Sequence, residues 1–294
     1  MLLDRVAGAP ISWGVCEVPG WGHQLPPARV LTEMRAAGLV ATEFGPDGFL
    51  PADPAAKAAE LADHGLAAVG GFVPVVLHDP DRDPMAAITT ALAGFTAAGA
   101  TSLVLSADTG GTGYDQRAEL DAAAWRLLLA NLDRIRDAAG ELGITATLHP
   151  HVGTVVERRE DVARVLDGAT IPLCLDTGHL MIGGTDPAAL AADVPDRIAH
   201  AHLKDVDATA AARVRAGEVA YSAAVAAGMY RPLGTGDADI AAIIRSLEGA
   251  GYTGWYVLEQ DTVLTAEPPP GHGPPADVLA GVAFVRGVAA ELEP

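Results

Sequence analysis

The sequence predicts an α/β protein in which eight strand–helix units close into one (β/α)8 barrel. Three observations support this prediction. Helical segments, glycines and short apolar runs recur in that order, the length of 294 residues is near the roughly 250 typical of such barrels, and 50% of the residues are hydrophobic. Short apolar runs alternating with helices are typical of parallel α/β folds, and eight such units favour a closed barrel over an open sheet.

The strands are expected where an apolar run starts after turn residues and ends in polar ones. In chain order they cover residues 9–13, 39–44, 66–77, 102–106, 144–148, 173–176, 198–204 and 255–259. A glycine precedes five of them, because this residue readily adopts the left-handed conformation that ends a helix. The segments between the strands carry helical spacing, as in the apolar residues at positions 128, 132, 135, 139 and 142.

Two stretches interrupt this rhythm. Residues 205–235 form a long connection after the seventh strand, and loops of this length are more often lids or binding loops than simple connectors. Residues 267–275 are rich in proline and predict a stiff, extended spacer before the last helix. Neither stretch has the composition of an interdomain linker, so residues 1–294 are expected to form a single domain with a lid at about 205–235.

Composition restricts the partners and the compartment. The 38 acidic residues outnumber the 19 basic ones and give a formal net charge of −19. This charge repels nucleic acid and anionic membranes, because phosphate binding needs clusters of Lys and Arg. Cys16 and Cys174 are too few for a disulfide scaffold, and Cys174 is expected to be a buried free thiol. The amino terminus lacks an apolar signal segment, which predicts a cytoplasmic protein.

Polar, ionisable side chains follow almost every predicted strand. They include Glu43, His78, Asp79, Asp108, His149, His151, Asp176, His179, His202, Lys204, Asp205, Glu259 and Asp261, with Trp13 and Glu17 after the first strand. In a barrel these strand ends meet at one face, where converging carboxylates repel one another unless a cation or protons neutralise them. Mixed imidazole and carboxylate ligands suit Mn, Co or Zn better than Mg. The sequence therefore predicts a divalent metal site.

Each of these residues also has a plainer interpretation. Asp176 could cap the turn that follows it, and His202 could be a hydrogen-bonded core histidine. Glu259 ends an apolar strand, where a buried carboxylate without a partner would be costly, so a functional role is favoured. Glu43 is compatible with catalysis, with substrate binding or with an ion pair. His200 shares a strand face with His202 and is expected to support it.

Two groups of motifs run along the chain. General ones are LDTGH at 175–179, HLKD at 202–205, LGTGDAD at 233–239 and GYTGW at 251–255, and more specific ones are APISWG at 9–14, TEFGP at 42–46, GFLP at 48–51 and HPHVGT at 149–154. Over nearly its whole length the chain resembles the xylose isomerase-like TIM barrels, a superfamily of sugar isomerases and epimerases, and within it the inosose dehydratases of myo-inositol breakdown.

This resemblance implies a metal held by Glu, Asp, His and Glu from four barrel positions. The last three positions match Asp176, His202 and Glu259, whereas the first falls on His149, where this chain has no glutamate. The dehydratase-like members also tend to lack that glutamate. His151 is the alternative ligand if the strand register differs.

The resemblance also implies the reaction. A cyclic polyol ketone, an inosose, would lose its α-proton to give an enediolate and then lose its β-hydroxyl as water. The candidate catalytic residues are Glu259, His151 and Lys204, the last of which could stabilise the oxyanion. The candidate substrate-binding residues, also at strand ends, are Trp13, Glu43, His179 and Asp205.

Three other functions are alternatives for a barrel of this kind. A sugar or keto-sugar epimerase or isomerase would need a second carboxylate, and Glu43 is expected to lie too far along the barrel to supply it. An abasic-site endonuclease shares the barrel but needs a cationic groove, which the charge of −19 argues against. A metal-free barrel that binds a small molecule is the third. A homo-oligomer is compatible with the sequence, and the expected partner is a small cyclic polyol or sugar.

Overall fold

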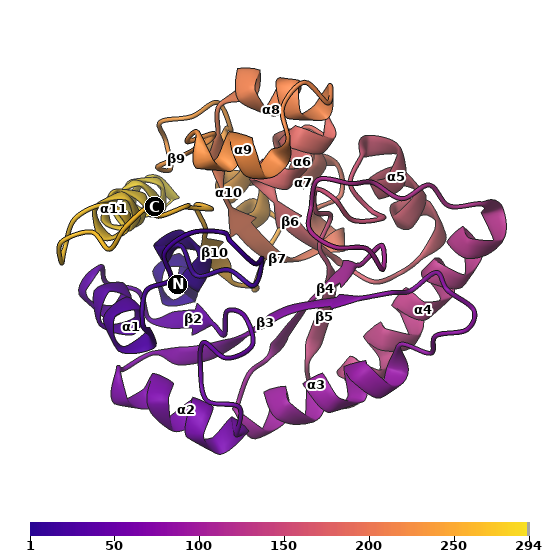
Figure 1. The fold of residues 1–294 in the computed structure, drawn as a ribbon, viewed down its shortest axis with the longest axis horizontal. Helices are drawn as coiled ribbons and strands as arrows, with labels where there is room; N and C mark the ends of the chain where they lie inside the picture. The colour runs from indigo at the N-terminus through magenta and orange to yellow at the C-terminus, as the bar shows by residue number, and fades with distance from the viewer. Residues whose placement is uncertain (293–294) are drawn as a thin grey trace.

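The computed structural model describes residues 1–292, and within them eight parallel strands form a closed barrel with the order β1-β10-β7-β6-β5-β4-β3-β2. Helices surround the barrel, and α2, α3 and α4 cover its lower side in Figure 1. The predicted (β/α)8 barrel is therefore confirmed. The barrel strands are β1 (Val6–Gly8), β2 (Ala41–Glu43), β3 (Ala67–Val75), β4 (Ser102–Ala107), β5 (Thr145–Leu148), β6 (Leu173–Asp176), β7 (Ile198–Leu203) and β10 (Tyr256–Leu258).

The helices pack their apolar residues against the outer face of the barrel and form the main core. Aspartates at several N-caps accept hydrogen bonds from the first turn, as Asp121 does at α4. None of the helices in residues 1–292 is both long and apolar enough to span a membrane. The α-helices are α1 (Pro27–Ala36), α2 (Pro54–Asp63), α3 (Met85–Ala97), α4 (Ala122–Gly140), α5 (Arg159–Gly168), α6 (Thr177–Gly183), α7 (Pro187–Asp193), α8 (Ala208–Arg215), α9 (Tyr221–Ala226), α10 (Ile240–Gly249) and α11 (Pro274–Leu292).

The first strand lies earlier than the sequence predicts. Residues 9–13 were expected to form it, but Pro10–Trp13 is a 3-10 helix and the strand is Val6–Gly8. Pro10 has no N–H for a sheet ladder and is favoured at the first position of a helical turn. Gly14, with φ of 78°, ends this turn in the left-handed conformation. The prediction was wrong because an apolar run alone does not distinguish a strand from a short helical turn.

The barrel interior is layered from small apolar to ionisable side chains. Ala41 of β2 and Val257 of β10 belong to a small cluster of buried apolar residues. Alternate residues of a strand point to the same face, so Glu43 and Glu259, each two positions further on, also point inward. The same alternation on β7 directs both His200 and His202 into the barrel. The ionisable layer therefore lies at the carboxyl ends of the strands.

Residues 205–235 are largely regular structure instead of an irregular loop. They contain α8, α9 and a small antiparallel sheet of β8 (Asp205–Val206) and β9 (Tyr230–Arg231). These elements lie together beside α6 at the top of Figure 1. They have a hydrophobic cluster of their own, to which Trp21 and Val152 of other loops also contribute. The helix that follows this segment, α10, begins at Ile240, after its capping residue Asp239.

Candidate functional site

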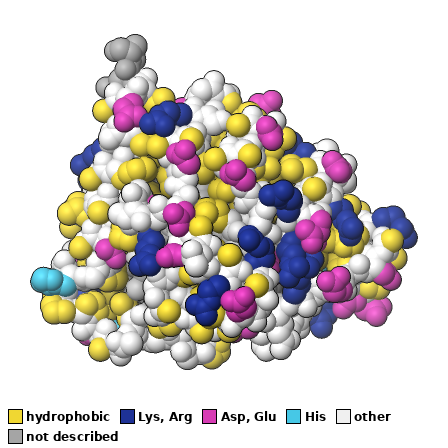
Figure 2. Space-filling view, turned by 90° about the horizontal axis from the view of Figure 1, so that it is seen from above, with side chains coloured by type: hydrophobic (Ala, Val, Ile, Leu, Met, Phe, Trp, Pro, Cys, Tyr) yellow, Lys and Arg dark blue, Asp and Glu magenta, His cyan; other side chains and the backbone are white. Residues whose placement is uncertain are grey.

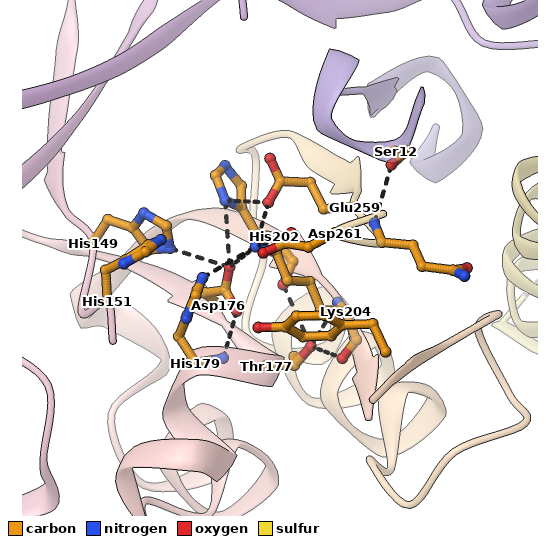
Figure 3. Close-up of polar contacts among 12 residues, drawn as sticks. Ser12, His149, His151, Asp176, Thr177, His179, His202, Lys204, Glu259 and Asp261 are labelled. Atoms are coloured by element: carbon orange, nitrogen blue, oxygen red, sulfur yellow. Dashed lines mark hydrogen bonds and ion pairs between the residues drawn. The ribbon is translucent and has the colours of Figure 1, made fainter. Parts of the chain in front are cut away.

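The carboxyl ends of β2, β5, β6, β7 and β10 bring ionisable side chains to one place inside the barrel mouth. The close-up in Figure 3 shows His149, Asp176, His202 and Glu259, from the ends of four of these strands, pointing toward one another. A cavity of about 750 Å³ opens beside them, which is within the usual range for small-molecule sites. The predicted site residues and their neighbours that line it are Glu43, His149, His151, His202, Lys204, Tyr221, Glu259 and Asp261.

The centre of the site is His202, whose two ring nitrogens face different partners. Its Nε2 donates to Glu43 Oε1 at 3.0 Å, and this carboxylate oxygen also accepts from His200 at 3.0 Å. Nδ1 of His202 then faces two carboxylate oxygens, Oδ2 of Asp176 at 3.5 Å and Oε2 of Glu259 at 3.2 Å. This arrangement resembles a histidine ligand oriented by a carboxylate behind it.

The residues present fit a divalent metal. Within residues 1–292, Nδ1 of His202 has no hydrogen-bond partner. Asp176, His202 and Glu259 can each offer one ligand atom, and these three atoms lie within 4.8 Å of one another. An imidazole lone pair aimed at two carboxylates is unfavourable unless a proton or a cation lies between them. Burial opposes a charged ring, but Cys174, Glu259 and Glu43 raise the pKa of His202 well above its ordinary value, so the site attracts positive charge.

The structure distinguishes the two histidines that follow β5. Nε2 of His149 lies 3.1 Å from Asp176 Oδ2, at the edge of the proposed ligand set. Nδ1 of His151 instead donates to the carbonyl oxygen of Val152 at 2.7 Å. His151 Nε2 is then the unprotonated nitrogen of the ring. Burial, followed by His149 and Lys204, lowers the pKa of His151 well below its ordinary value, so this ring is neutral.

The ammonium group of Lys204 lies among carboxylates. Its Nζ is 2.8 Å from Asp261 Oδ1, 3.0 Å from Glu259 Oε2 and 3.4 Å from Asp176 Oδ2. Burial favours the neutral amine, but Asp176, Asp261 and Glu259 raise the pKa of Lys204 well above its usual value. Lys204 is therefore a charged, buried cation at the edge of the site.

Three of the predicted substrate-binding residues do not line the cavity. The Trp13 side chain is fully buried, and its indole donates to Glu33 at 2.9 Å because the turn after β1 directs it toward α1. Asp205 is also fully buried. His179 stacks on His151 with the ring centroids 3.8 Å apart, behind the cavity wall. Of the four residues predicted for this role, Glu43 lines the cavity.

Asp205 instead anchors the chain where the segment 205–235 returns to the barrel. Its carboxylate accepts backbone N–H groups of Val206, Gly234, Gly236 and Ala238 at 2.8–3.0 Å. A Cβ atom on Gly236 would lie 2.3 Å from Oδ1 of Asp205, so only glycine fits this close approach. This is a structural role for the aspartate of the HLKD motif.

Sequence reasoning missed two tyrosines of the site. Tyr221, at the start of α9, donates to Asp261 Oδ2 at 2.6 Å. Tyr114, from the loop after β4, hydrogen-bonds Glu17 and stacks on His151 with the ring centroids 4.5 Å apart. Both residues lie in segments without strand or helix periodicity, so no signal of the repeating unit marks them.

Comparison with known proteins extends these observations. A family model described as Xylose isomerase-like TIM barrel matches residues 31–286. The Rhizopine catabolism protein MocC of Rhizobium meliloti is 32% identical over 267 residues, which are 87% of this chain and 81% of that protein. An inosose dehydratase of Geobacillus kaustophilus (strain HTA426) is 31% identical over 270 residues, or 87% of each chain.

Solved structures share the fold at lower identity. An L-ribulose 3-epimerase superposes with a TM-score of 0.69 at 16% identity, over 98% of this chain and 95% of the other. A probable 3-DHS dehydratase from Bacillus anthracis gives a TM-score of 0.67 at 13% identity, over 96% and 98% of the two chains. The IOLI protein, whose structure has a zinc atom bound, gives 0.67 at 13% identity, over 98% and 99%. The family model and the two relatives above 30% identity together show that the chain belongs to the xylose isomerase-like TIM barrel family.

Proposed function

We propose that this protein is a divalent-metal-dependent dehydratase that acts on a cyclic polyol ketone of the inosose type through an enediolate. The observation that carries this proposal is the donor set Asp176, His202 and Glu259 at the barrel mouth, with His149 at the position of the remaining glutamate ligand that the resemblance implies. Several relatives that the chain matches over 86–87% of its length are named inosose dehydratase, which supports this substrate class.

In this proposal Asp176, His202 and Glu259 hold the metal, and His149 completes the set. Mn, Co or Zn would suit these ligands. The metal would act as a Lewis acid that polarises the ketone and lowers the cost of removing the neighbouring proton. Glu43 holds the tautomer of His202 through its 3.0 Å hydrogen bond with Nε2, which keeps Nδ1 free as a ligand.

His151 is the proposed base for the α-proton. It lines the cavity, its Nδ1 proton is held by the carbonyl of Val152, and its Nε2 lone pair is therefore free. Glu259, the other candidate base, already faces both His202 and Lys204. The ammonium of Lys204 would stabilise negative charge on the enediolate. The β-hydroxyl would then leave as water after it receives a proton from His151, which the first step has protonated.

The second candidate function is a sugar or keto-sugar epimerase of the same family. Glu43 favours it, because closure of the barrel brings this residue within 3.0 Å of His202 instead of leaving it remote as expected from the sequence. A second carboxylate of the kind that reversible proton transfer needs is thus near the centre. However, one oxygen of Glu43 already accepts from both His200 and His202, which suits support of His202 better than proton transfer.

Mass spectrometry of scyllo-inosose incubated with Mn-loaded protein in heavy water tests the proposal. We expect a product lighter by one water. Unchanged composition with deuterium at the α-carbon and a new stereoisomer would mean an epimerase. If no inosose or ketose of a panel is converted with Mn, Co or Zn, the enzymatic proposal is wrong and a barrel that only binds a small molecule is left.

A further inference from the structure

Lys204 contacts the oxygens that would hold the metal. The oxygen of Asp176 at 3.4 Å from Lys204 Nζ is Oδ2, and the oxygen of Glu259 at 3.0 Å is Oε2. These are the two oxygens that face Nδ1 of His202. The Lys204 side chain is only 3% exposed, so water does not screen its charge. The ammonium and a divalent cation would therefore share the same two carboxylate oxygens.

The ammonium is well satisfied where it lies. An ammonium group has three N–H donors, and Nζ of Lys204 has close acceptors in Asp261 at 2.8 Å, Glu259 at 3.0 Å and His179 Nε2 at 3.1 Å. Asp261 gives this cation one carboxylate outside the proposed ligand set. Lys204 can therefore keep an ionic partner when Asp176 and Glu259 coordinate a metal.

We infer that Lys204 is a built-in cation that competes with the divalent metal for Asp176 and Glu259 and thereby weakens metal binding. Metal binding then transfers the ammonium from these two carboxylates to Asp261, which is left as its one carboxylate partner beside the ring nitrogen of His179. This inference rests on the metal site of the proposed function. It goes beyond that site in assigning Lys204 control over metal affinity, because like charges a few ångströms apart repel strongly in a buried site.

The chain offers a matched control, because Lys57 and Lys204 are its only two lysines. Lys57, on α2, also lines the cavity, but its Nζ lies over the ring of Phe44 at 4.5 Å from the centroid. We propose calorimetric titration of Mn²⁺ into the chelator-treated parent, Lys204→Met and Lys57→Met. The methionine keeps the length and apolar stem of lysine and removes the charge.

We expect Lys204→Met to bind Mn²⁺ about tenfold more tightly than the parent, or more, and Lys57→Met to match the parent. Equal or weaker binding by Lys204→Met overturns the inference while leaving the metal site in place. If Lys204→Met binds Mn²⁺ and the parent does not, the inference is supported and metal dependence of the parent is contradicted. No binding by either protein contradicts both.

A measurement on the parent covers the case in which Lys204→Met does not fold. Labelling with ¹⁵N-lysine gives two side-chain Nζ signals, and the Lys57→Met protein shows which one belongs to Lys204. Diamagnetic Zn²⁺ should shift the Lys204 signal at the same concentration at which it binds and leave the Lys57 signal in place. A Lys204 signal that stays unchanged while Zn²⁺ binds would overturn the inference.

Discussion

At the scale of single residues, hydrogen bonds decide which nitrogen of each histidine is free. Glu43 accepts from Nε2 of His202, which leaves Nδ1 for a cation. The Val152 carbonyl accepts from Nδ1 of His151, which leaves Nε2 as a base. His149 differs from both because its Nε2 faces Asp176. The three imidazoles of one cavity wall therefore differ in which ring nitrogen is available to a metal or a proton.

We predict that His149 and His151 separate metal binding from proton transfer. His149→Ala should weaken metal binding by about 10–100-fold, the usual effect of losing a metal-supporting contact. His151→Ala should keep its metal and lower kcat by about 10²–10⁴-fold, as expected for loss of a general base. Elemental analysis and steady-state kinetics with scyllo-inosose measure the two effects. The opposite pattern would make His151 the ligand.

At the scale of elements, the sequence predicts most strands but not the structures inserted between them. Buried parallel strands such as 173–176 are continuous apolar runs with polar ends, and a period-two pattern then points alternate residues inward. That pattern is enough to bring Asp176 and His202 together. It fails at 9–13, where Pro10 favours a helical turn, because proline acts on the backbone and not through hydrophobicity.

Residues 205–235 illustrate what such patterns leave out. The segment contains α8 and α9, and one of its residues, Tyr221, enters the site. Tyr221 hydrogen-bonds Asp261, and the neighbouring Ser222 hydrogen-bonds Asp115 of the loop after β4. These are contacts across long sequence separations, so neither local propensity nor the eight-fold repeat carries a signal for them.

We predict that residues 205–235 close over the substrate. Arg213 and Arg215 are exposed in this segment, so trypsin cleavage after them reports on its opening. Addition of an unreactive polyol such as myo-inositol should slow cleavage, because a bound ligand would hold Tyr221 in the site. The Ser222→Ala protein loses the hydroxyl hydrogen bond to Asp115 and keeps the backbone one. It should be cleaved faster than the parent without ligand. Cleavage of the parent at the same rate with and without polyol at saturation would count against closure.

At the scale of the whole molecule, charge is distributed unevenly between surface and interior. On the face seen in Figure 2, basic side chains are interspersed with acidic ones, although acidic residues are twice as numerous in the chain. That nucleic acid is not a partner stays a prediction from the net charge of −19. Cytoplasmic location and homo-oligomer formation stay predictions from the sequence.

Besides the acidic residues of the surface, the barrel interior holds a cluster of buried carboxylates. Asp176, Glu259 and Asp261 are buried around Lys204, and Glu43 is buried against His200 and His202. Burying carboxylates is costly unless cations or protons compensate them. Composition and strand-end position predict that these residues converge. They place Lys204 at the same barrel face but do not reveal which carboxylates its ammonium contacts, because the direction of a long, flexible side chain depends on the packed surroundings.

We predict, finally, that a divalent metal stabilises the whole fold. A ligand that binds the folded state and not the unfolded chain adds about 2.7 kcal/mol at a hundred times its dissociation constant. For a domain of this size that corresponds to a rise in Tm of roughly 5 °C. Differential scanning fluorimetry of chelator-treated protein with and without Mn²⁺ measures it. Asp176→Asn should show no rise, because it removes a ligand charge while keeping the volume of the side chain. A parent protein whose Tm does not change with Mn²⁺, Co²⁺ or Zn²⁺ would contradict a metal site in the buried carboxylate cluster.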